Sequence, residues 1–220
     1  MRRSIAGLVL AVVVAGPACS QGLIDDAAQA AIDRSRETHA TYSVFTWNRV
    51  SFPDANPFEE WSAEFHDGDL HRVETPRDRL IANCASQTGT HYNAVTGERV
   101  SGPSIARAAC GVQANSRILS ATFDGRKAGP FGVVEKITIR DPENVRTYEI
   151  MADGALVGAT IELEDGTVLL DARAVAVETT VPRDIFSEES LERSAVPERY
   201  RKPPANEVSL KTTARHERAL

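Results

Sequence analysis

Four Asp-Gly pairs constrain the fold of this 220-residue chain more than any other local feature. Asp-Gly is strongly favoured in two-residue β-hairpin turns, because both turn positions need positive φ angles. Residues typical of strands flank each pair, so each pair predicts a hairpin. The pairs are Asp67-Gly68, Asp124-Gly125, Asp153-Gly154 and Asp165-Gly166. We therefore expect a chain rich in antiparallel strands.

The last two turns also predict the register of three strands, since both turns place Ala159 on the same face. The expected pairs are Ile150 with Val157, Tyr148 with Ala159, Leu163 with Val168, Ile161 with Leu170, and Ala159 with Ala172. One face of this meander is then apolar and the other carries charged residues, which is typical of an antiparallel sheet with one buried side. Ile137 and Ile139 extend it by another strand.

Hydrophobic periodicity predicts the remaining elements. Apolar residues at helical spacing indicate a helix from Leu23 to Arg36, and a short helix is expected from Pro103 to Ala109 with Ser104 as its cap. The other expected elements are strands at Tyr42–Val50, Glu60–His66 and Thr90–Ala94, a break at Pro53–Pro57 and a loop at Arg126–Gly132. The predicted fold class is α+β, mainly β: a curved antiparallel meander, or half-barrel, with the N-terminal helix and short helices packed on one face.

The first twenty residues have the pattern of an export signal. Two arginines precede an apolar run from Ile5 to Val14, which is shorter than the roughly 18 to 20 residues of a membrane span. Cleavage before Cys19 would leave a thiol for lipid attachment, and cleavage after Ala18 or Ser20 would give a plain secreted chain. The residues before Cys19 match a lipobox only in part, so both alternatives stay open. The predicted location is the bacterial periplasm, with an outer-membrane anchor if Cys19 is acylated.

One domain is expected after the signal peptide (residues 1–20), over residues 23–190. Beyond Phe186 the apolar content falls and charged residues and prolines take over. Such a composition cannot bury enough apolar surface to offset the entropy of ordering. Residues 191–220 are therefore predicted to form a polar, disordered C-terminal tail.

Cys84 and Cys110 are the two cysteines of this domain. Because the periplasm is oxidising, we expect them to form a disulfide. The alternatives are two separate buried thiols, a metal site or a reactive thiol. Between the two cysteines only His91 is available, and the CxxC spacing of many metal ligands is absent. No metal site is predicted there, and no histidine is placed to activate a thiol.

Charge and motifs argue against several classes of function. Without its first twenty residues the chain has 23 basic and 31 acidic residues, a net charge of −8, which argues against a nucleic-acid partner. The sequence has no nucleophile elbow, P-loop, HExxH or dinucleotide-binding motif, so neither a cofactor nor an enzymatic activity is predicted.

Two clusters of polar residues near the first hairpin leave alternatives open. A turn at Asp67-Gly68 would place Glu64 opposite His71 and His66 opposite Asp69 on one face. This cluster is a candidate for a metal-dependent site, or a solvated strand face with cross-strand charge pairs. The charged stretch from Arg72 to Arg79 is interpreted as an exposed strand edge protected by charge, the alternative being a basic site for an anionic headgroup.

The order of these elements resembles that of the lipoprotein-carrier superfamily of bacterial envelopes (LolA/LolB-like sorting proteins and related sigma-factor regulators). The resemblance covers Leu23 to Phe186 and rests on the initial helix, the long meander, Trp61-Ser62-Ala63-Glu64-Phe65 and the segment from Pro182 to Phe186. It implies a curved sheet around a hydrophobic cavity covered by helices. The pair of cysteines departs from the carrier pattern, and no residue here matches the carriers' functional arginine or the receptor's protruding loop.

The expected function is non-enzymatic binding of a lipid, a lipoprotein or another hydrophobic partner. Small side chains on the apolar face leave room for an acyl chain or an apolar helix, or they admit the packing of the N-terminal helix. The alternative function is a structural or protein-interaction module with a fully packed core. The residues expected to line or support the cavity are Tyr42, Phe45, Trp47, Trp61, Phe65, Tyr148, Ile150, Ile161 and Leu170.

Overall fold

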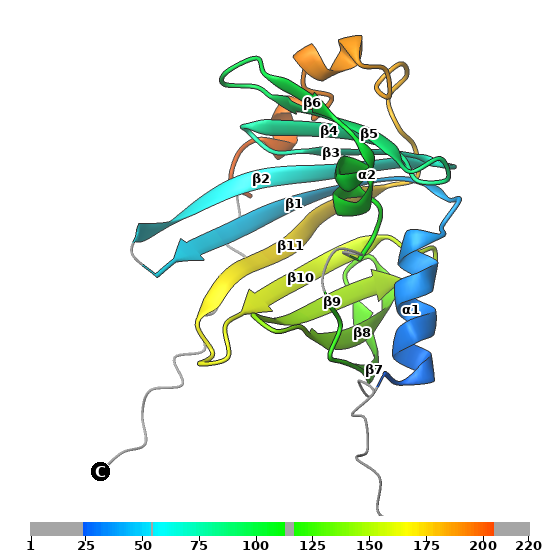
Figure 1. Ribbon diagram of the computed structural model, residues 1–220, viewed down its shortest axis with the longest axis vertical. Coiled ribbons are helices and arrows are strands. Elements are labelled where there is room, and N and C mark those ends of the chain that lie inside the picture. Colours follow the sequence, from blue (N-terminus) through cyan, green and yellow to red (C-terminus); the bar gives the residue numbers. More distant parts are fainter. Residues whose placement is uncertain (1–23, 54, 113–116, 205–220) are drawn as a thin grey trace, which may run out of the picture.

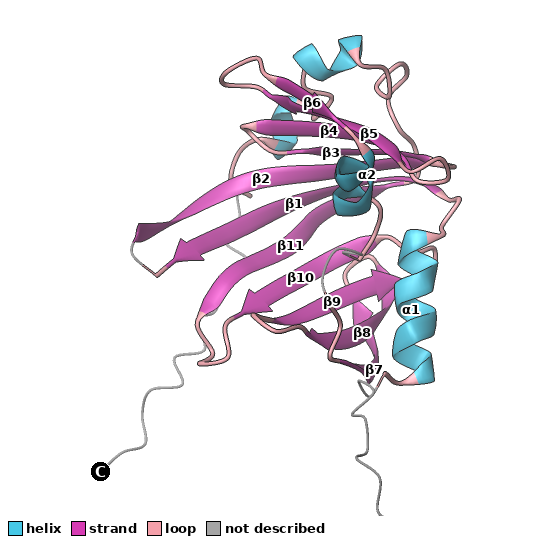
Figure 2. Ribbon diagram, in the orientation of Figure 1, coloured by secondary structure: helices cyan, strands magenta, loops and turns pink. Residues whose placement is uncertain are grey.

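The computed structural model describes residues 24–53, 55–112 and 117–204. These residues form one open, curved antiparallel sheet of 11 strands with two α-helices (Figures 1 and 2), which confirms the predicted fold class. The predicted signal peptide, Cys19 and residues 205–220 lie outside the described residues, and what we expect of them stays a prediction. In the described ranges, no helix has the length and apolar character that a membrane span requires.

The strand order is β6-β5-β4-β3-β2-β1-β11-β10-β9-β8-β7, so the first strand pairs with the last. The helices are α1 (Asp26–Arg36) and α2 (Pro103–Ala109), and two 3-10 helices follow the sheet, η1 (Glu189–Glu192) and η2 (Glu198–Tyr200). The strands are β1 (Thr41–Phe52), β2 (Ala55–Asp67), β3 (Leu70–Glu74), β4 (Asp78–Asn83), β5 (Thr88–Asn93), β6 (Arg99–Ser101), β7 (Ser120–Gly129), β8 (Gly132–Arg140), β9 (Val145–Met151), β10 (Leu156–Glu162) and β11 (Val168–Glu178).

Both α-helices lie on the same face of the sheet, which we call the helix face (Figure 1). α1 packs mainly on β7 and β8, and α2 packs on β3, β4 and β5. The apolar spacing in α1 places Ala28, Ala31 and Ile32 on one side, and all three are fully buried against Ile137 and Ile150. Because an isolated helix of this length is unstable in water, this packing is what holds α1.

The N-termini of both helices differ in detail from the prediction. α1 begins at Asp26, since Ile24 forms a β-bridge with Ala121 of β7, whose carbonyl accepts the Asp25 N–H (2.9 Å). α2 has the predicted bounds, but its N-cap residue is Gly102, and Ser104 lies inside the helix.

The predicted disulfide between Cys84 and Cys110 is present and joins the chain just after β4 to the end of α2. The chain then returns to α1, where the Val112 N–H donates to Ser35 Oγ (3.1 Å). Gly111 allows this approach: its φ is +72°, and a Cβ there would lie 2.4 Å from Ser35 O. Glycine is therefore required at this position.

The opposite face is covered by residues 181–204, which we call the C-terminal segment. Val196 is buried against Phe65 in a cluster that also contains Phe45, and the Tyr200 ring stacks on Phe45 at 4.1 Å between centroids. The prediction of a disordered tail from residue 191 onwards is therefore wrong for the described part of that tail.

A buried ion pair explains why such a polar segment is ordered. Arg72 and Glu74 on β3 are fully buried, with Arg72 Nε 2.6 Å from Glu74 Oε1. Buried charges must be paired and hydrogen-bonded, or their desolvation is very costly. The C-terminal segment supplies the missing partners: Arg72 donates to Ser190 Oγ and to the carbonyls of Ile185 and Arg193, and Glu74 accepts from Ser194 Oγ and the Ala195 N–H.

The same pair corrects the interpretation of the stretch from Arg72 to Arg79 as an exposed strand edge. β3 lies between β2 and β4 inside the sheet, and the Arg79 guanidinium donates to the carbonyl of Leu191 (2.7 Å). Arg72, Glu74 and Arg79 therefore hold the C-terminal segment, and this stretch does not form an open edge.

The turns at Asp153-Gly154 and Asp165-Gly166 form the predicted hairpins. Three predicted pairs are confirmed: Tyr148 with Ala159, Ile161 with Leu170, and Ala159 with Ala172. The two pairs nearest the turns differ, because irregularities shift the register there. Ile150 pairs with Leu156 instead of Val157, and Val168 pairs with Glu162 instead of Leu163.

The turn predicted at Asp124-Gly125 is wrong. This pair lies inside β7, where Gly125 has a φ of +105° and the register with β8 shifts, as in a β-bulge. β7 continues to Gly129 and the chain reverses before Gly132, so the loop predicted at Arg126–Gly132 is also wrong.

The first hairpin turns one residue later than predicted. Asp67 pairs with Leu70, so Gly68 and Asp69 form the turn and His66 lies opposite His71. Since the shift moves the pairing by two residues, the same side chains still share a face. β2 also begins at Ala55, so the break predicted at Pro53–Pro57 is shorter than expected.

Replacing both cysteines by serine (C84S/C110S) should lower the free energy of unfolding by about 3.5 kcal/mol, because the disulfide closes a loop with a sequence separation of 26. Urea unfolding of the oxidised wild type and the double variant measures the difference. Equal midpoints for the two proteins would contradict this expectation.

Glu74→Ala should lower the free energy of unfolding by about 3 to 5 kcal/mol, because it leaves the Arg72 guanidinium buried without its counter-ion. The control is Glu192→Ala, which removes an exposed pair with Arg99 (2.8 Å) and should cost at most about 1 kcal/mol. Urea unfolding compares the two variants. Equal losses of unfolding free energy would show that the buried Arg72–Glu74 pair contributes no more to stability than an exposed pair.

Candidate functional site

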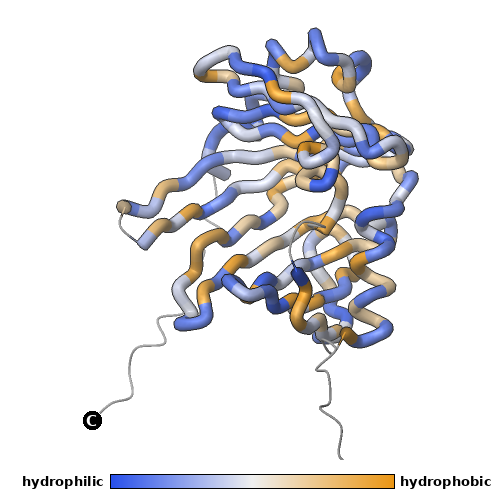
Figure 3. The backbone as a smooth tube through the Cα atoms, viewed as in Figure 1, coloured by the Kyte–Doolittle hydropathy of each residue, from blue (hydrophilic) through white to orange (hydrophobic). Residues whose placement is uncertain are grey.

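The central strands of the helix face carry apolar side chains that the described helices leave largely uncovered. α1 and α2 pack on the two ends of the sheet, with β1, β10 and β11 between them (Figure 1). Strand pairing aligns four half-buried apolar side chains on this face, which we call the apolar patch: Val50, Ile161, Leu170 and Ala172. Leu170 pairs with both Val50 and Ile161, so the patch is continuous across three strands. Figure 3 shows the apolar character of β11 at this place.

The other side of the same strands is polar. Glu149 accepts from Lys127 Nζ (2.7 Å) and from Arg173 (3.0 Å), and Arg173 also pairs with Asp171 (2.8 Å). Alternation along the strands separates this ion-pair network from the apolar patch. The patch is therefore one side of an amphipathic sheet, and the side facing the helices is the apolar one.

The nine residues predicted to line one cavity fall into two groups with the sheet between them. On the helix face lie Tyr42, Tyr148, Ile150, Ile161 and Leu170. On the opposite face lie Phe45, Trp47, Trp61 and Phe65. Of the nine, Ile161 and Leu170 belong to the apolar patch, and Tyr42, Tyr148 and Ile150 are buried in the core.

A pocket of about 430 Å³ lies elsewhere, between β3 to β6 and the start of the C-terminal segment. Its wall mixes apolar side chains such as Leu70, Ile81 and Phe186 with a polar group in which Thr90 Oγ1 donates to Glu188 Oε1 (3.0 Å). None of the nine predicted residues lines it. Sequence reasoning missed this pocket, because its wall needs the C-terminal segment to be folded.

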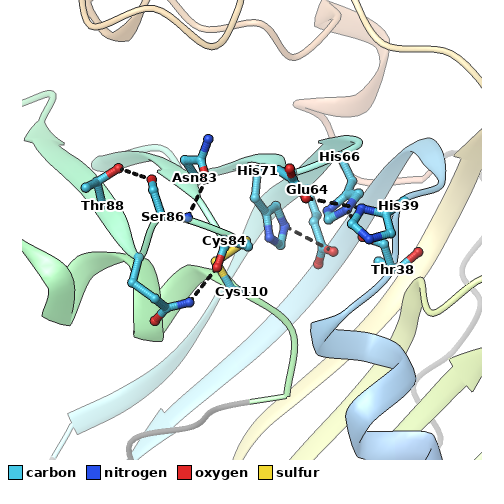
Figure 4. The surroundings of a disulfide bond; sticks show 12 residues. Thr38, His39, Glu64, His66, His71, Asn83, Cys84, Ser86, Thr88 and Cys110 are labelled. Carbon is cyan, nitrogen blue, oxygen red and sulfur yellow. Dashed lines mark hydrogen bonds and ion pairs between the residues drawn. A yellow bond between two sulfur atoms is a disulfide. The ribbon is translucent and has the colours of Figure 1, made fainter.

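The candidate cluster Glu64, His66 and His71 is brought together on the helix face, beside the disulfide (Figure 4). His71 Nε2 lies 3.1 Å from Glu64 Oε1, and the rings of His66 and His71 meet edge to face at 5.0 Å. The Tyr42 hydroxyl donates to Glu64 (2.8 Å). Asp69 does not join the cluster, since it pairs with His39 (3.1 Å).

Burial and close contacts shift the pKa values of Glu64, Tyr42 and His66. Burial raises the pKa of Glu64, but its contacts with His71 and Tyr42 lower the pKa by more, so the carboxyl ionises below its usual range. Burial raises the pKa of Tyr42 far above its usual range, and Glu64 adds to this rise. Burial and the neighbouring His71 lower the pKa of His66. Both histidines are only 2% exposed, so this polar network lies inside the molecule and a bulky substrate cannot reach their rings.

Comparison with known proteins gives matches of structure alone: no protein-family model and no curated protein sequence matches the chain. An uncharacterized conserved protein from Thermus thermophilus is similar over 80% of this chain and 98% of its own, with 17% identity and a TM-score of 0.52. This similarity shows a shared fold.

Two further solved structures are similar to the chain with lower TM-scores. MucB, in the Pseudomonas aeruginosa MucA/MucB complex, has 10% identity and a TM-score of 0.49, covering 77% of this chain and 62% of that one. A LolA superfamily protein from Nitrosomonas europaea has 10% identity and a TM-score of 0.39, covering 74% of this chain and 99% of that one.

Proposed function

We propose that this chain is a non-enzymatic protein of the bacterial envelope that binds an acyl chain, of a lipid or a lipoprotein, on the helix face of its sheet. The observation that carries the proposal is the apolar patch, which lies between two helix-covered regions and stays half-buried. Each CH₂ group of an acyl chain that becomes buried on this patch contributes about 0.8 kcal/mol to the free energy of binding.

The shape of the patch favours a slender ligand. Ala172 lies in the patch, and Ala159 and Ala174 border it, so small side chains leave space above the sheet between bulkier neighbours. Leu170, Val50 and Ile161 provide apolar contact across the strands. No positive charge lies in the patch itself, so we expect the ligand's polar end to remain outside it.

The proposed location follows from the leader and is independent of the patch. We propose that residues 1–18 direct export and that Cys19 carries the lipid anchor. An oxidising compartment accords with the Cys84–Cys110 disulfide.

Ala172→Glu should reduce binding of a fluorescent fatty acid at least about tenfold, because a carboxylate in the patch must be desolvated when the acyl chain binds. The matched control is Thr160→Glu on β10, whose side chain faces the ion-pair network, where Arg173 Nη2 lies 3.3 Å from Thr160 Oγ1. Fluorescence titration of the mature wild type and both variants measures the affinities, with urea midpoints to confirm that each is folded.

Two results would overturn this proposal. One is equal binding by all three proteins, which would place the probe elsewhere. The other is no binding by the wild type together with no lipid in native mass spectra of protein purified from its own host. The second result would favour a protein-interaction module instead.

The intact mass of the mature protein tests the proposed anchor. We expect a chain that begins at Cys19 and carries the added mass of a diacylglyceryl group and an acyl group. A mass that matches an unmodified chain beginning after Ala18 or Ser20 would show a plain secreted form.

A further inference from the structure

His71 is a buried histidine that is only partly satisfied: Nε2 is in ion-pair contact with Glu64, and Nδ1 has no hydrogen-bond partner among the described residues. Its side chain is only 2% exposed, and neither ring nitrogen has a hydrogen-bond partner of good geometry among the described residues. Its charged neighbour is Glu64, whose Oε1 lies 3.1 Å from Nε2. Buried polar groups are nearly always hydrogen-bonded, so an unsatisfied ring nitrogen at this depth requires an explanation.

The two sulfur atoms of the disulfide lie next to this ring. A ring nitrogen of His71 and the sulfurs of Cys84 and Cys110 all lie within 4.8 Å of one another. Figure 4 shows His71 between the disulfide on one side and Glu64 on the other. The three residues come from β3, the end of β4 and the end of α2, so the fold assembles them from separate parts of the chain.

We propose that reduction of the Cys84–Cys110 disulfide converts this place into a site for one zinc-class divalent cation, with Cys84, Cys110 and His71 as its ligands. A dithiol supplies two electrons and two protons: the S–S bond breaks, two thiols form, and the dithiol becomes a disulfide. The cation then binds as each thiol releases its proton to solvent. This inference does not depend on the proposed acyl-chain function.

The dimensions and the chemistry suit such a cation. Zinc binds thiolate sulfur at about 2.3 Å and imidazole nitrogen at about 2.0 to 2.1 Å in a tetrahedral arrangement, which places ligand atoms about 3.5 Å apart. Two cysteines and one histidine leave a fourth position open for water. The two cysteine Cα atoms are 5.8 Å apart, so the freed sulfurs can separate by side-chain rotation.

Glu64 is placed where a metal-binding histidine needs a partner. A histidine that binds a metal through one nitrogen commonly donates its other N–H to a carboxylate, which fixes the orientation of the ring. Glu64 stands at Nε2, and Nδ1 is the nitrogen without a charged neighbour. Cys84 is only half-buried, so a reductant and an ion can approach from its side.

Co²⁺ binds at zinc sites and absorbs visible light, so a Co²⁺ titration of the mature chain tests the proposal. The protein is reduced with a phosphine under argon, titrated with Co²⁺, and compared with the oxidised chain. We expect one Co²⁺ for each reduced chain, with thiolate-to-metal charge-transfer bands and intense tetrahedral visible bands, and neither feature for the oxidised chain. His71→Ala should weaken binding at least about 100-fold, since even losing an outer partner of a ligand costs about 10- to 100-fold.

Two controls separate this site from a chance pair of thiols. His91→Ala removes a histidine that pairs with Asp78 (2.8 Å), and should leave Co²⁺ binding unchanged. C84S/C110S removes the disulfide and the thiols of Cys84 and Cys110, and should be folded by circular dichroism but bind no Co²⁺. Binding by His71→Ala with wild-type affinity and spectrum, binding by the oxidised chain, or unfolding of the reduced wild type would each overturn the proposal.

Discussion

The pairing of β1 with β11 is the constraint on which the rest of this structure depends. Within the described sheet, it joins one half, β1 to β6, to the other half, β7 to β11. The apolar patch lies across this junction, because Val50 of β1 pairs with Leu170 of β11. Three of the four patch residues lie on β10 and β11, and Val50 of β1 completes the patch, so the full binding face requires β1 and β11 to be in register.

The two faces of the sheet are stabilised by different physical effects. On the helix face, α1 and α2 bury mainly alanines and isoleucines against the sheet. On the opposite face, the C-terminal segment is held partly by apolar contacts with Phe45 and Phe65 and partly by the buried Arg72–Glu74 pair. Such a pair specifies one arrangement, since every charge-assisted hydrogen bond must be made.

Much of the fold could be predicted from the sequence, because strict alternation of apolar and polar residues beside an Asp-Gly turn leaves little freedom in the register of the two strands. The pairs Tyr148–Ala159 and Ile161–Leu170 follow from this rule. The same rule failed at Asp124-Gly125, where the glycine lies in a bulge within a strand. The dipeptide alone does not distinguish such a bulge from a turn.

The position of the apolar surface was predicted less well, since Tyr42 and Phe45 were assigned to one cavity although odd spacing places them on opposite faces. No pattern in the sequence shows that His71, rather than His91, lies beside the cysteines, because only the pairing of β3 with β4 brings it there.

The buried Arg72 also orders the events of folding. Its hydrogen-bond partners at Ile185, Ser190 and Arg193 follow the last strand of the sheet, so they leave the ribosome after all eleven strands. Until they arrive, β3 cannot close over a guanidinium without leaving it desolvated and only partly bonded, which opposes early collapse of the N-terminal half.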